Sequence, residues 1–370
     1  MQTRQGFLRG AAGLAGAGLA LPLLGACAPG NTAESYQAAA QRIWQPANPV
    51  SSNRAAMLRE LVRYATLAPS GHNAQCWKFH VGPDSISILP DFARRTPVVD
   101  PDDHHLFVSL GCALENLAQA SLAHGLSSQA QFDAAKDTLT VKLLQTPAQS
   151  SPLFKAITDR QCTRGPFDGK PLSVLELKTL ELAGNGEGVS MVLFTAKPDV
   201  DKLLDFVVQG NTAQLHDAAF VKELKQWLRF GASEAVAAGD GLYSLTSGNP
   251  SVPRWLGSPM FDIMISADSE NDKYASQVRS SSGIAVFVSG VDDKAHWIEA
   301  GRCYERFALQ ATALGIRNAM LNQAVEVPAQ RQRLAALLGL KSGRPDLVVR
   351  FGRGAKMPSS LRRRVEDVLI

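Results

Sequence analysis

Two stretches of this 370-residue chain share a helical pattern and can be laid over each other at a shift of 190 residues. The first runs from about Leu106 to His124, and the second from His296 to Leu314. In this register four positions match: Gly111 with Gly301, Glu115 with Glu305, Ala123 with Ala313, and Gly125 with Gly315. Glycine commonly ends a helix because it adopts the left-handed conformation without strain. The repeated helix therefore predicts two related halves within one chain.

A second pair of segments repeats ahead of these helices. Apolar and polar residues alternate from Trp77 to Val81 as in a half-buried strand, and a shift of 113 places Trp77 opposite Ser190 and Val81 opposite Phe194. The two shifts differ by 77 residues, so the second half should carry an insertion at about residues 197–279. We expect an α+β fold in which a duplicated unit forms a pseudo-dimer, with antiparallel sheets flanked by helices. Chance similarity between two amphipathic helices that end in glycine is the alternative.

The N-terminal residues have the layout of an export signal. Arg4 and Arg9 precede an apolar run over residues 11–24, and no acidic residue occurs before Glu34. The run ends in Leu-Gly-Ala-Cys, which resembles a bacterial lipobox with Cys27 as the lipidated residue. We therefore expect an exported protein that a lipid anchors to the membrane, on the periplasmic or cell-surface side. A disordered leader with a chance cysteine is the alternative.

The export route is less clearly marked. Residues 3–9 resemble a twin-arginine signal in which Gln5 replaces the second arginine.

These patterns divide the chain into four parts. Residues 1–27 are predicted to be a signal peptide with its lipobox, and residues 28–50, rich in Ala, Pro, Asn and Ser, a tether. The first half is expected at 51–150, and the second, with its insertion, at 151–370.

Charge and composition exclude some classes of function. The net charge of +4 and the isoelectric point near 8.8 are mild, and 45% hydrophobic residues suit a globular protein with a large core. Arg362–Arg364 lie beside Glu366 and Asp367, so we interpret them as a solvated helix end rather than a phosphate-binding patch. Nucleic-acid binding is not expected.

Cysteines and histidines give little sign of a metal site. None of the five cysteines lies in a CxxC pair, which argues against a thioredoxin-like motif or a zinc knuckle. His104 and His105 follow Asp102 and Asp103, and we interpret them as caps or surface groups rather than as metal ligands.

The first motif that can carry chemistry is Ala68–Trp77, which joins a helix to a strand. Such a loop can direct Ser70, Asn73 and Gln75, together with backbone N–H groups, at a flat polar edge such as an isoalloxazine ring. A plain turn is the alternative interpretation.

The second motif is Arg160–Phe167. Arg160 and Arg164, four residues apart and close to hydroxyl-sized side chains, can grip a phosphate. A surface turn with exposed arginines is the alternative.

The first two motifs resemble those of the nitroreductase family. Ala68–Trp77 is similar to its signature Ala-Pro-Ser-x-x-Asn-x-Gln-Pro-Trp, with Cys76 in place of the proline. Arg160–Phe167 is similar to its Arg-Arg-Ser-x-Arg phosphate motif, and more so to the Arg-x-Thr-Asn-Arg-Gly-Pro-Phe form of the tandem, Acg-like group. Gln161 and Cys162 depart from both patterns and weaken the expected phosphate grip, because Gln carries no charge and Cys is a poor donor.

A third segment, from Ala313 to Phe351, shares the layout of that family. The resemblance places Leu321–Gln323 near the flavin N5 and lets Arg350 or Arg353 complete the phosphate pocket. Without the family, Arg350 and Arg353 could equally be strand-end charges. Four arginines would then face one phosphate dianion.

The resemblance covers roughly residues 54–354 and implies a duplicated, FMN-dependent nitroreductase fold with one complete site per chain. The implied FMN contacts are Pro69, Ser70, Asn73, Gln75, Arg160, Gln161, Cys162, Arg164, Leu321, Asn322, Gln323, Arg350 and Arg353. His72 is a candidate proton donor only. The insertion segment Gly241–Pro250, with Trp255 beyond it, is either a lid over the site or a surface loop.

Three functions remain open at this stage. The first is an FMN-dependent oxidoreductase that acts on a small substrate, aromatic ones included, by ping-pong electron transfer. The second is a flavin-sequestering protein without turnover, and the third is an apo structural lipoprotein. The electron donor is unknown, because no GxGxxG fingerprint follows a strand and NAD(P)H should be scarce outside the inner membrane.

Overall fold

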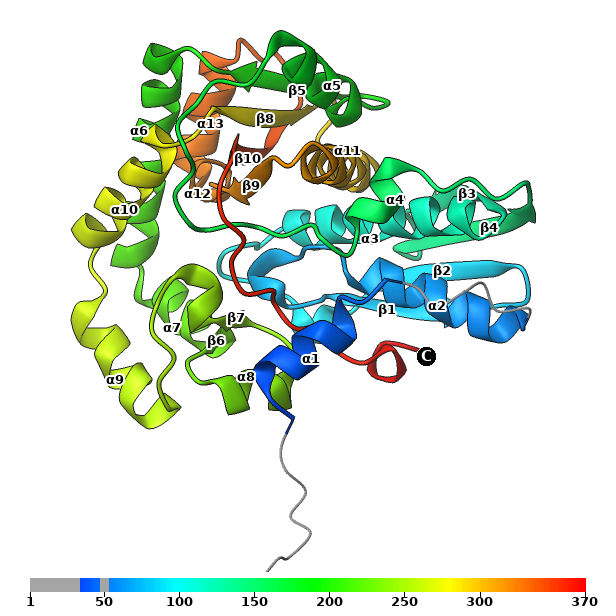
Figure 1. Ribbon diagram of the computed structural model, residues 1–370. Helices are drawn as coiled ribbons and strands as arrows, with labels where there is room; N and C mark the ends of the chain where they lie inside the picture. The colour runs from blue at the N-terminus through cyan, green and yellow to red at the C-terminus, as the bar shows by residue number, and fades with distance from the viewer. Residues whose placement is uncertain (1–33, 47–52) are drawn as a thin grey trace, which may run out of the picture. The chain divides into compact units, whose positions relative to one another are not determined.

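Two four-stranded antiparallel sheets organise the computed structural model, which describes residues 34–46 and 53–370 (Figure 1). The predicted signal peptide, Cys27 and both ends of the predicted tether lie outside the described residues. The first sheet has the order β1 (Trp77–Val81), β2 (Ser85–Pro90), β4 (Thr138–Gln145), β3 (Leu126–Asp133). The second has the order β5 (Val189–Phe194), β8 (Gly283–Ser289), β10 (Arg344–Gly352), β9 (Arg317–Met320). Numbered within each half, both orders are 1-2-4-3, which confirms the α+β class and supports the duplication.

The two halves meet through their long central helices, α3 (His104–Ala123) and α11 (Lys294–Ala313), which lie between the sheets (Figure 1). A Cβ atom at Gly111 would lie 1.9 Å from the carbonyl oxygen of Ile298, and one at Gly301 would lie 2.0 Å from that of Val108. Both pairs are related by the 190-residue shift found in the sequence. Reciprocal contacts of this kind are the mark of a two-fold interface, here within one chain.

Burial along the strands explains how the sheets differ. In β1 and β2 the buried residues alternate, as in a sheet with one solvated face. In β8 and β10 every residue is buried, because alternate side chains enter two different cores. Ala285 and Phe287 pack in the core shared with α3 and α11, whereas Ile284 and Val286 pack with the insertion helix α6.

The insertion lies between β5 and β8 and covers the outer face of the second sheet. It consists of α6 (Lys197–His216), α7 (Ala218–Trp227), β6 (Leu228–Arg229), α8 (Ala232–Ala238), β7 (Leu242–Tyr243), a 3-10 turn (Ser244–Ser247), α9 (Arg254–Met264) and α10 (Ala267–Arg279). The other helices are α2 (Arg54–Thr66), α4 (Pro152–Ala156), α5 (Val174–Gly184), α12 (Gln323–Glu326) and α13 (Pro328–Leu337), with further 3-10 turns at Gly71–Asn73, Phe92–Arg94 and Val365–Asp367. Residues 34–370 form one compact unit, so the two halves share a core.

Part of the predicted tether is instead a packed helix, α1 (Tyr36–Ile43). Ser35 caps its first turn, and Ala39 is buried against Ala235 of α8 and Tyr243 of β7. Its alanine-rich composition suits either a linker or a helix, because alanine also favours helices. Only the tertiary contact with the insertion shows that this segment is a helix.

After β10 the chain returns to the first half (Figure 1). Phe79 of β1 donates its N–H to the carbonyl of Val368 and accepts from the N–H of Ile370, so the last residues pair with the outer edge of the first sheet. Arg362 is buried, and its guanidinium donates to the carbonyls of Thr66, Leu67 and Ala68 at the end of α2. The prediction of a solvated helix end was therefore wrong for this arginine.

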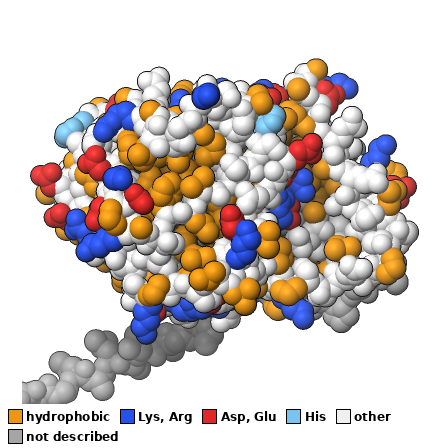
Figure 2. Space-filling view, turned by 90° about the horizontal axis from the view of Figure 1, so that it is seen from above, with side chains coloured by type: hydrophobic (Ala, Val, Ile, Leu, Met, Phe, Trp, Pro, Cys, Tyr) orange, Lys and Arg blue, Asp and Glu red, His pale blue; other side chains and the backbone are white. Residues whose placement is uncertain are grey.

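Helix α3 is apolar and long enough by composition to cross a membrane, but 78% of its apolar stretch is buried inside the fold, as in a core helix. Lys and Arg side chains are interspersed with Asp and Glu on the face seen in Figure 2. Cys76, Cys112, Cys162 and Cys303 are free thiols.

Candidate functional site

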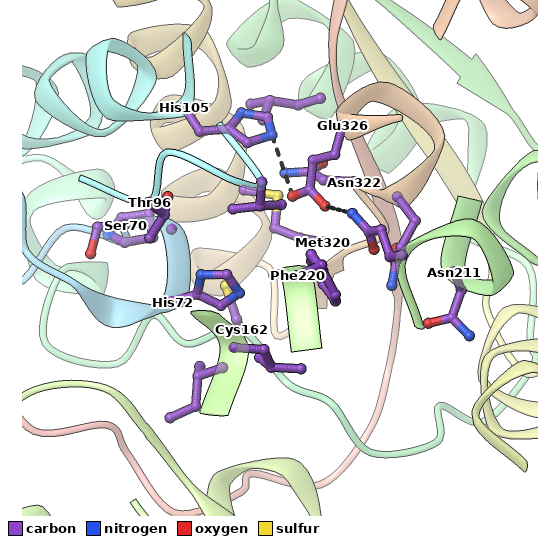
Figure 3. A pocket seen from close by; sticks show the side chains of 18 of the residues that line it. Ser70, His72, Thr96, His105, Cys162, Asn211, Phe220, Met320, Asn322 and Glu326 are labelled. Atoms are coloured by element: carbon purple, nitrogen blue, oxygen red, sulfur yellow. Dashed lines mark hydrogen bonds and ion pairs between the residues drawn. The ribbon is translucent and has the colours of Figure 1, made fainter. Parts of the chain in front are cut away.

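A cavity of about 260 Å³ lies where the three motifs meet (Figure 3). The first half contributes the loop Pro69–His72 and residues of α3, and the second contributes Cys162, Arg164 and the segment after β9. The insertion closes the remaining wall. The residues that line it include Pro69, Ser70, His72, His105, Cys112, Cys162, Arg164, Gln214, Glu270, Tyr274, Asn322, Gln323 and Glu326.

The signature loop has an unusual backbone. His72, Asn73 and Gln75 all have positive φ angles of 49° to 54°, a region that non-glycine residues seldom occupy. Strain of this kind persists only where the surroundings hold it, and it is concentrated at functional sites. Ser70 supports the loop, because its hydroxyl accepts from the N–H of Gln75 at 2.9 Å.

Asn73 and Gln75 hold this loop in place and do not line the cavity. The Asn73 amide donates to the carbonyls of Gly241 and Leu361, and its oxygen accepts from Arg362 at 2.9 Å. The Gln75 amide donates to the carbonyl of Gly239 at 2.9 Å. The motif therefore ties the loop to the insertion and to the C-terminal segment. The structure does not place Asn73 and Gln75, which were predicted to contact FMN, at the cavity.

His72 lies at the cavity wall (Figure 3). Burial lowers the pKa of His72 to about 4, so the ring is neutral at pH 7. Its Nδ1 is buried and has no hydrogen-bond partner among the described residues.

Only one of the four predicted phosphate-binding arginines reaches the cavity. Arg164 lines it, and its guanidinium makes no ion pair or hydrogen bond within the described part of the chain. Arg160 is buried against Glu305 at 3.0 Å and donates to the carbonyl of Leu67. Arg353 pairs with Glu176 at 2.6 Å. The structure does not bring the four predicted arginines together at the cavity, because other acceptors engage three of them.

Arg350 supports Arg164 from behind. Its Nη2 donates to the carbonyls of Thr163 and Gly165, at 3.0 and 2.8 Å, on either side of Arg164. Gln161 is likewise structural, since its amide exchanges two hydrogen bonds with the backbone of Met357. These contacts fix the loop that presents Arg164.

The third motif reaches the cavity through two of its three residues. Asn322 and Gln323 line it, whereas Leu321 is fully buried in the core beside α6. Asn322 is fixed because its side-chain oxygen accepts from the N–H of Val348 at 3.1 Å. The Oε1 of Gln323 is buried without a partner among the described residues.

A set of three polar side chains that contact one another in the cavity wall was not predicted from the sequence. His105 pairs with Glu326 at 3.4 Å, and Gln214 donates to the other oxygen of Glu326 at 2.6 Å (Figure 3). The adjacent histidines were considered only as caps, surface groups or metal ligands. Among the described residues no metal-binding group of His, Cys, Asp and Glu is found. Nothing in the sequence could reveal that α12 places Glu326 opposite α3.

The segment Gly241–Pro250, a lid or a surface loop by its sequence, reaches the cavity through one residue. Leu242 lines the cavity, as do Leu215 and Phe220 from earlier in the insertion. Trp255 is 75% exposed and does not line the cavity.

No family model matches the chain. "Putative NAD(P)H nitroreductase Rv3131" of Mycobacterium tuberculosis is 24% identical over 327 residues, which cover 84% of this chain and 90% of that protein. "Putative NAD(P)H nitroreductase acg" of the same species is 23% identical over 330 residues, covering 84% of this chain and 95% of that protein.

Among solved structures, a nitroreductase with bound FMN from Bacteroides fragilis covers 56% of this chain and 90% of its own, at 13% identity and a TM-score of 0.35. The FMN-dependent nitroreductase NfnB from Mycobacterium smegmatis in complex with NADPH covers 55% and 87%, at 14% identity and a TM-score of 0.35. The similarity to the two full-length mycobacterial relatives, together with the convergence of the motifs on one cavity, supports the resemblance of this chain to the nitroreductase family.

Proposed function

We propose that this chain is an FMN-dependent oxidoreductase of nitroreductase type, of the tandem group, which reduces a small substrate by ping-pong electron transfer. The observation that carries the proposal is the meeting of three separate motifs, from both halves, on one cavity where Arg164 has no side-chain partner among residues 34–46 and 53–370. FMN, when bound, supplies the redox chemistry, while the protein positions it and controls access.

The residues at the cavity fit a flavin. Two buried polar atoms, Nδ1 of His72 and Oε1 of Gln323, find no partner in the described part of the chain and suit the polar edge of a heterocycle. Arg164 is the cation that would meet the phosphate, with Cys162 beside it on the same loop. The cavity lies just below the usual size of small-molecule sites, roughly 300–1,000 Å³.

Flavin sequestration without turnover is the second candidate, and the insertion that lines one wall of the cavity favours it. Purified mature protein separates the candidates. A yellow protein whose flavin is bleached anaerobically by NADH or NADPH supports the reductase, and one bleached by neither NAD(P)H nor dithionite supports sequestration. A colourless protein that takes up no FMN contradicts both and leaves the apo structural lipoprotein. The relatives' names motivate NAD(P)H as the first donor to test.

Arginine variants test the phosphate contact directly. Arg164→Ala should weaken FMN binding by about 1.5–3 kcal/mol, because one charge-assisted contact is lost. Arg353→Ala is the matched control and should leave affinity unchanged, since Arg353 already pairs with Glu176. Titration of the apo-protein by flavin fluorescence measures both. Equal FMN affinity in the two variants contradicts the assigned pocket.

Export and lipid anchoring at Cys27 belong to the same proposal and rest on residues 1–27 of the sequence. Metabolic labelling with a palmitate analogue, compared with Cys27→Ala, tests the anchor. Label in that variant equal to wild type contradicts it.

A further inference from the structure

A line of hydrogen bonds runs from the buried core of the second half to the cavity wall. Ser289 donates to Oδ2 of Asp346 at 2.7 Å, and Oδ1 of Asp346 lies 2.8 Å from Nε2 of His104. Nδ1 of His104 lies 3.0 Å from Nδ1 of His105. Nε2 of His105 then faces Glu326 at 3.4 Å. The line starts on β8 and β10, passes through the first turn of α3 and ends on α12.

The donor and acceptor roles along this line are restricted. Asp346 and Glu326 offer only oxygens when ionised, and a neutral imidazole has one donor and one acceptor nitrogen. If Asp346 is a carboxylate, His104 donates from Nε2 and accepts at Nδ1, so His105 must donate from Nδ1. With Glu326 ionised, His105 then also donates from Nε2 and is an imidazolium.

One other arrangement with the same number of protons satisfies every contact. Asp346 is then protonated and donates to His104, which donates from Nδ1 to His105, and His105 keeps its proton on Nε2. The two arrangements differ only by a shift of protons along the line. A proton held on Asp346 can therefore reach His105 without movement of the chain.

Burial and charge agree with this reading. Asp346 and His104 are 0% and 1% exposed. Burial raises the pKa of Asp346 to about 7 and lowers the pKa of His104 well below its ordinary value. Burial opposes a charge on His105, but the hydrogen bond to Glu326 and the charges of Asp100 and Glu326 raise the pKa of His105 above its ordinary value. The other charged or titratable groups that act on the line are His72, Asp292, Arg331 and Arg344.

We propose that His105 is the proton donor of the cavity, paired with Glu326 and resupplied from Asp346 through His104. His104 and Asp346 are positioning residues in this scheme. The inference rests on the proposed reductase function and adds to it the source of the proton that a two-electron acceptor takes up together with its electrons.

The step balances as follows. The acceptor gains a hydride equivalent from the reduced cofactor and a proton from His105. The Nε2–H bond of His105 breaks as an O–H bond forms on the acceptor. In exchange, Nδ1 of His105 takes the proton of His104, and Nε2 of His104 takes the proton of Asp346. Because Asp346 is fully buried, the next proton enters from the cavity at Nε2 of His105, and the protons along the line shift back towards Asp346.

The protonation of His105 can be measured without flavin. Nitrogen-15 NMR of the imidazoles in apo-protein should show His105 titrating above its ordinary value of 6.5, and Glu326→Gln should lower that pKa. Glu270→Gln is the matched control: it removes another carboxylate of the wall, one that pairs with Lys273, and should leave His105 unchanged. A His105 ring whose nitrogen shifts show no titration above 6.5 in wild type, or whose titration is insensitive to Glu326→Gln, overturns the proposal.

The kinetic arm uses flavin-loaded protein reduced with dithionite. Reoxidation by 1,4-benzoquinone, which needs protons, should slow on the order of 100-fold in His105→Gln, whereas reoxidation by ferricyanide, which needs none, should not change. Asp346→Asn should slow only the benzoquinone reaction and shift its pH profile, and it keeps the test available if His105→Gln fails to fold. Equal slowing for both oxidants, or for neither, refutes proton donation. A protein that binds no flavin contradicts the proposed function, whereas the NMR experiment on apo-protein still tests the pairing of His105 with Glu326.

Discussion

The crossing of α3 and α11 allows a quantitative test of the internal symmetry. A Cβ at Gly111 would approach the Ile298 oxygen to 1.9 Å, whereas ordinary contact begins near 3.4 Å, so an alanine must push the helices apart by roughly 1.5 Å. Both clashing atoms belong to helix backbones and cannot rotate away. Overpacking typically destabilises by about 1–3 kcal/mol and sometimes more. Alanine regains about 1 kcal/mol of helix propensity over glycine.

We therefore expect Gly111→Ala and Gly301→Ala each to lower the free energy of unfolding by about 2 kcal/mol, the upper end of the overpacking cost less the regained helix propensity. The double variant should fall short of the sum of the single effects by about 1 kcal/mol or more, because the helices separated by one alanine already accommodate the other. Urea unfolding followed by circular dichroism measures all three. Gly71→Ala is the control, since nothing lies within 4 Å of its Cβ.

Two results would refute this reasoning. A single variant as stable as wild type would show that the helices do not cross at these glycines. Strictly additive effects would show that the two sites are independent.

Two further predictions concern the signature loop. Arg362→Ala should destabilise the protein by about 3 kcal/mol or more and speed proteolysis of the loop, because several buried oxygens at the end of α2 lose their donor. The control is Arg364→Ala, which removes an exposed ion pair with Asp367. Equal urea midpoints for the two variants would contradict the Arg362 contact. His72 has a folded pKa of about 4 against 6.5 when unfolded, so below pH 6.5 the unfolded chain binds a proton that the folded one does not. Stability should therefore fall from pH 6.5 towards pH 4, with a slope of up to about 1.4 kcal/mol per pH unit from this group. His72→Gln should remove that slope, unlike His80→Gln at an exposed position of β1. A stability difference between His72→Gln and wild type that does not change with pH would disprove the assignment.

The duplicated architecture could be predicted from the sequence because it depends on local periodicity and on matched positions. Gly111 and Gly301 are informative since close helix approach admits no side chain, and that demand is visible as a repeated glycine. The α+β class followed from the same alternation of helices and strands. The helix α1 could not be distinguished from a linker, because its burial depends on α8, almost 200 residues later.

The site was predictable as a place but not as a set of contacts. Motif spacing locates the loops that carry Ser70, Arg164 and Asn322, and these residues do meet. Which arginine stays free depends on acceptors distant in sequence, such as Glu176 for Arg353. The same limit hid the pairing of His105 with Glu326, which are 221 positions apart.

The pairing of the last residues with β1 has a consequence for biosynthesis. Leu369 lies 290 positions after Phe79, its bridge partner. At about 5–20 residues per second, the ribosome needs on the order of 15–60 s to deliver it. Throughout that time the nascent first half exposes an unpaired strand edge, the kind of surface that recruits other chains. Co-translational folding before that point can therefore assemble the first sheet but cannot cover this edge, which stays unpaired until Leu369 has left the ribosome.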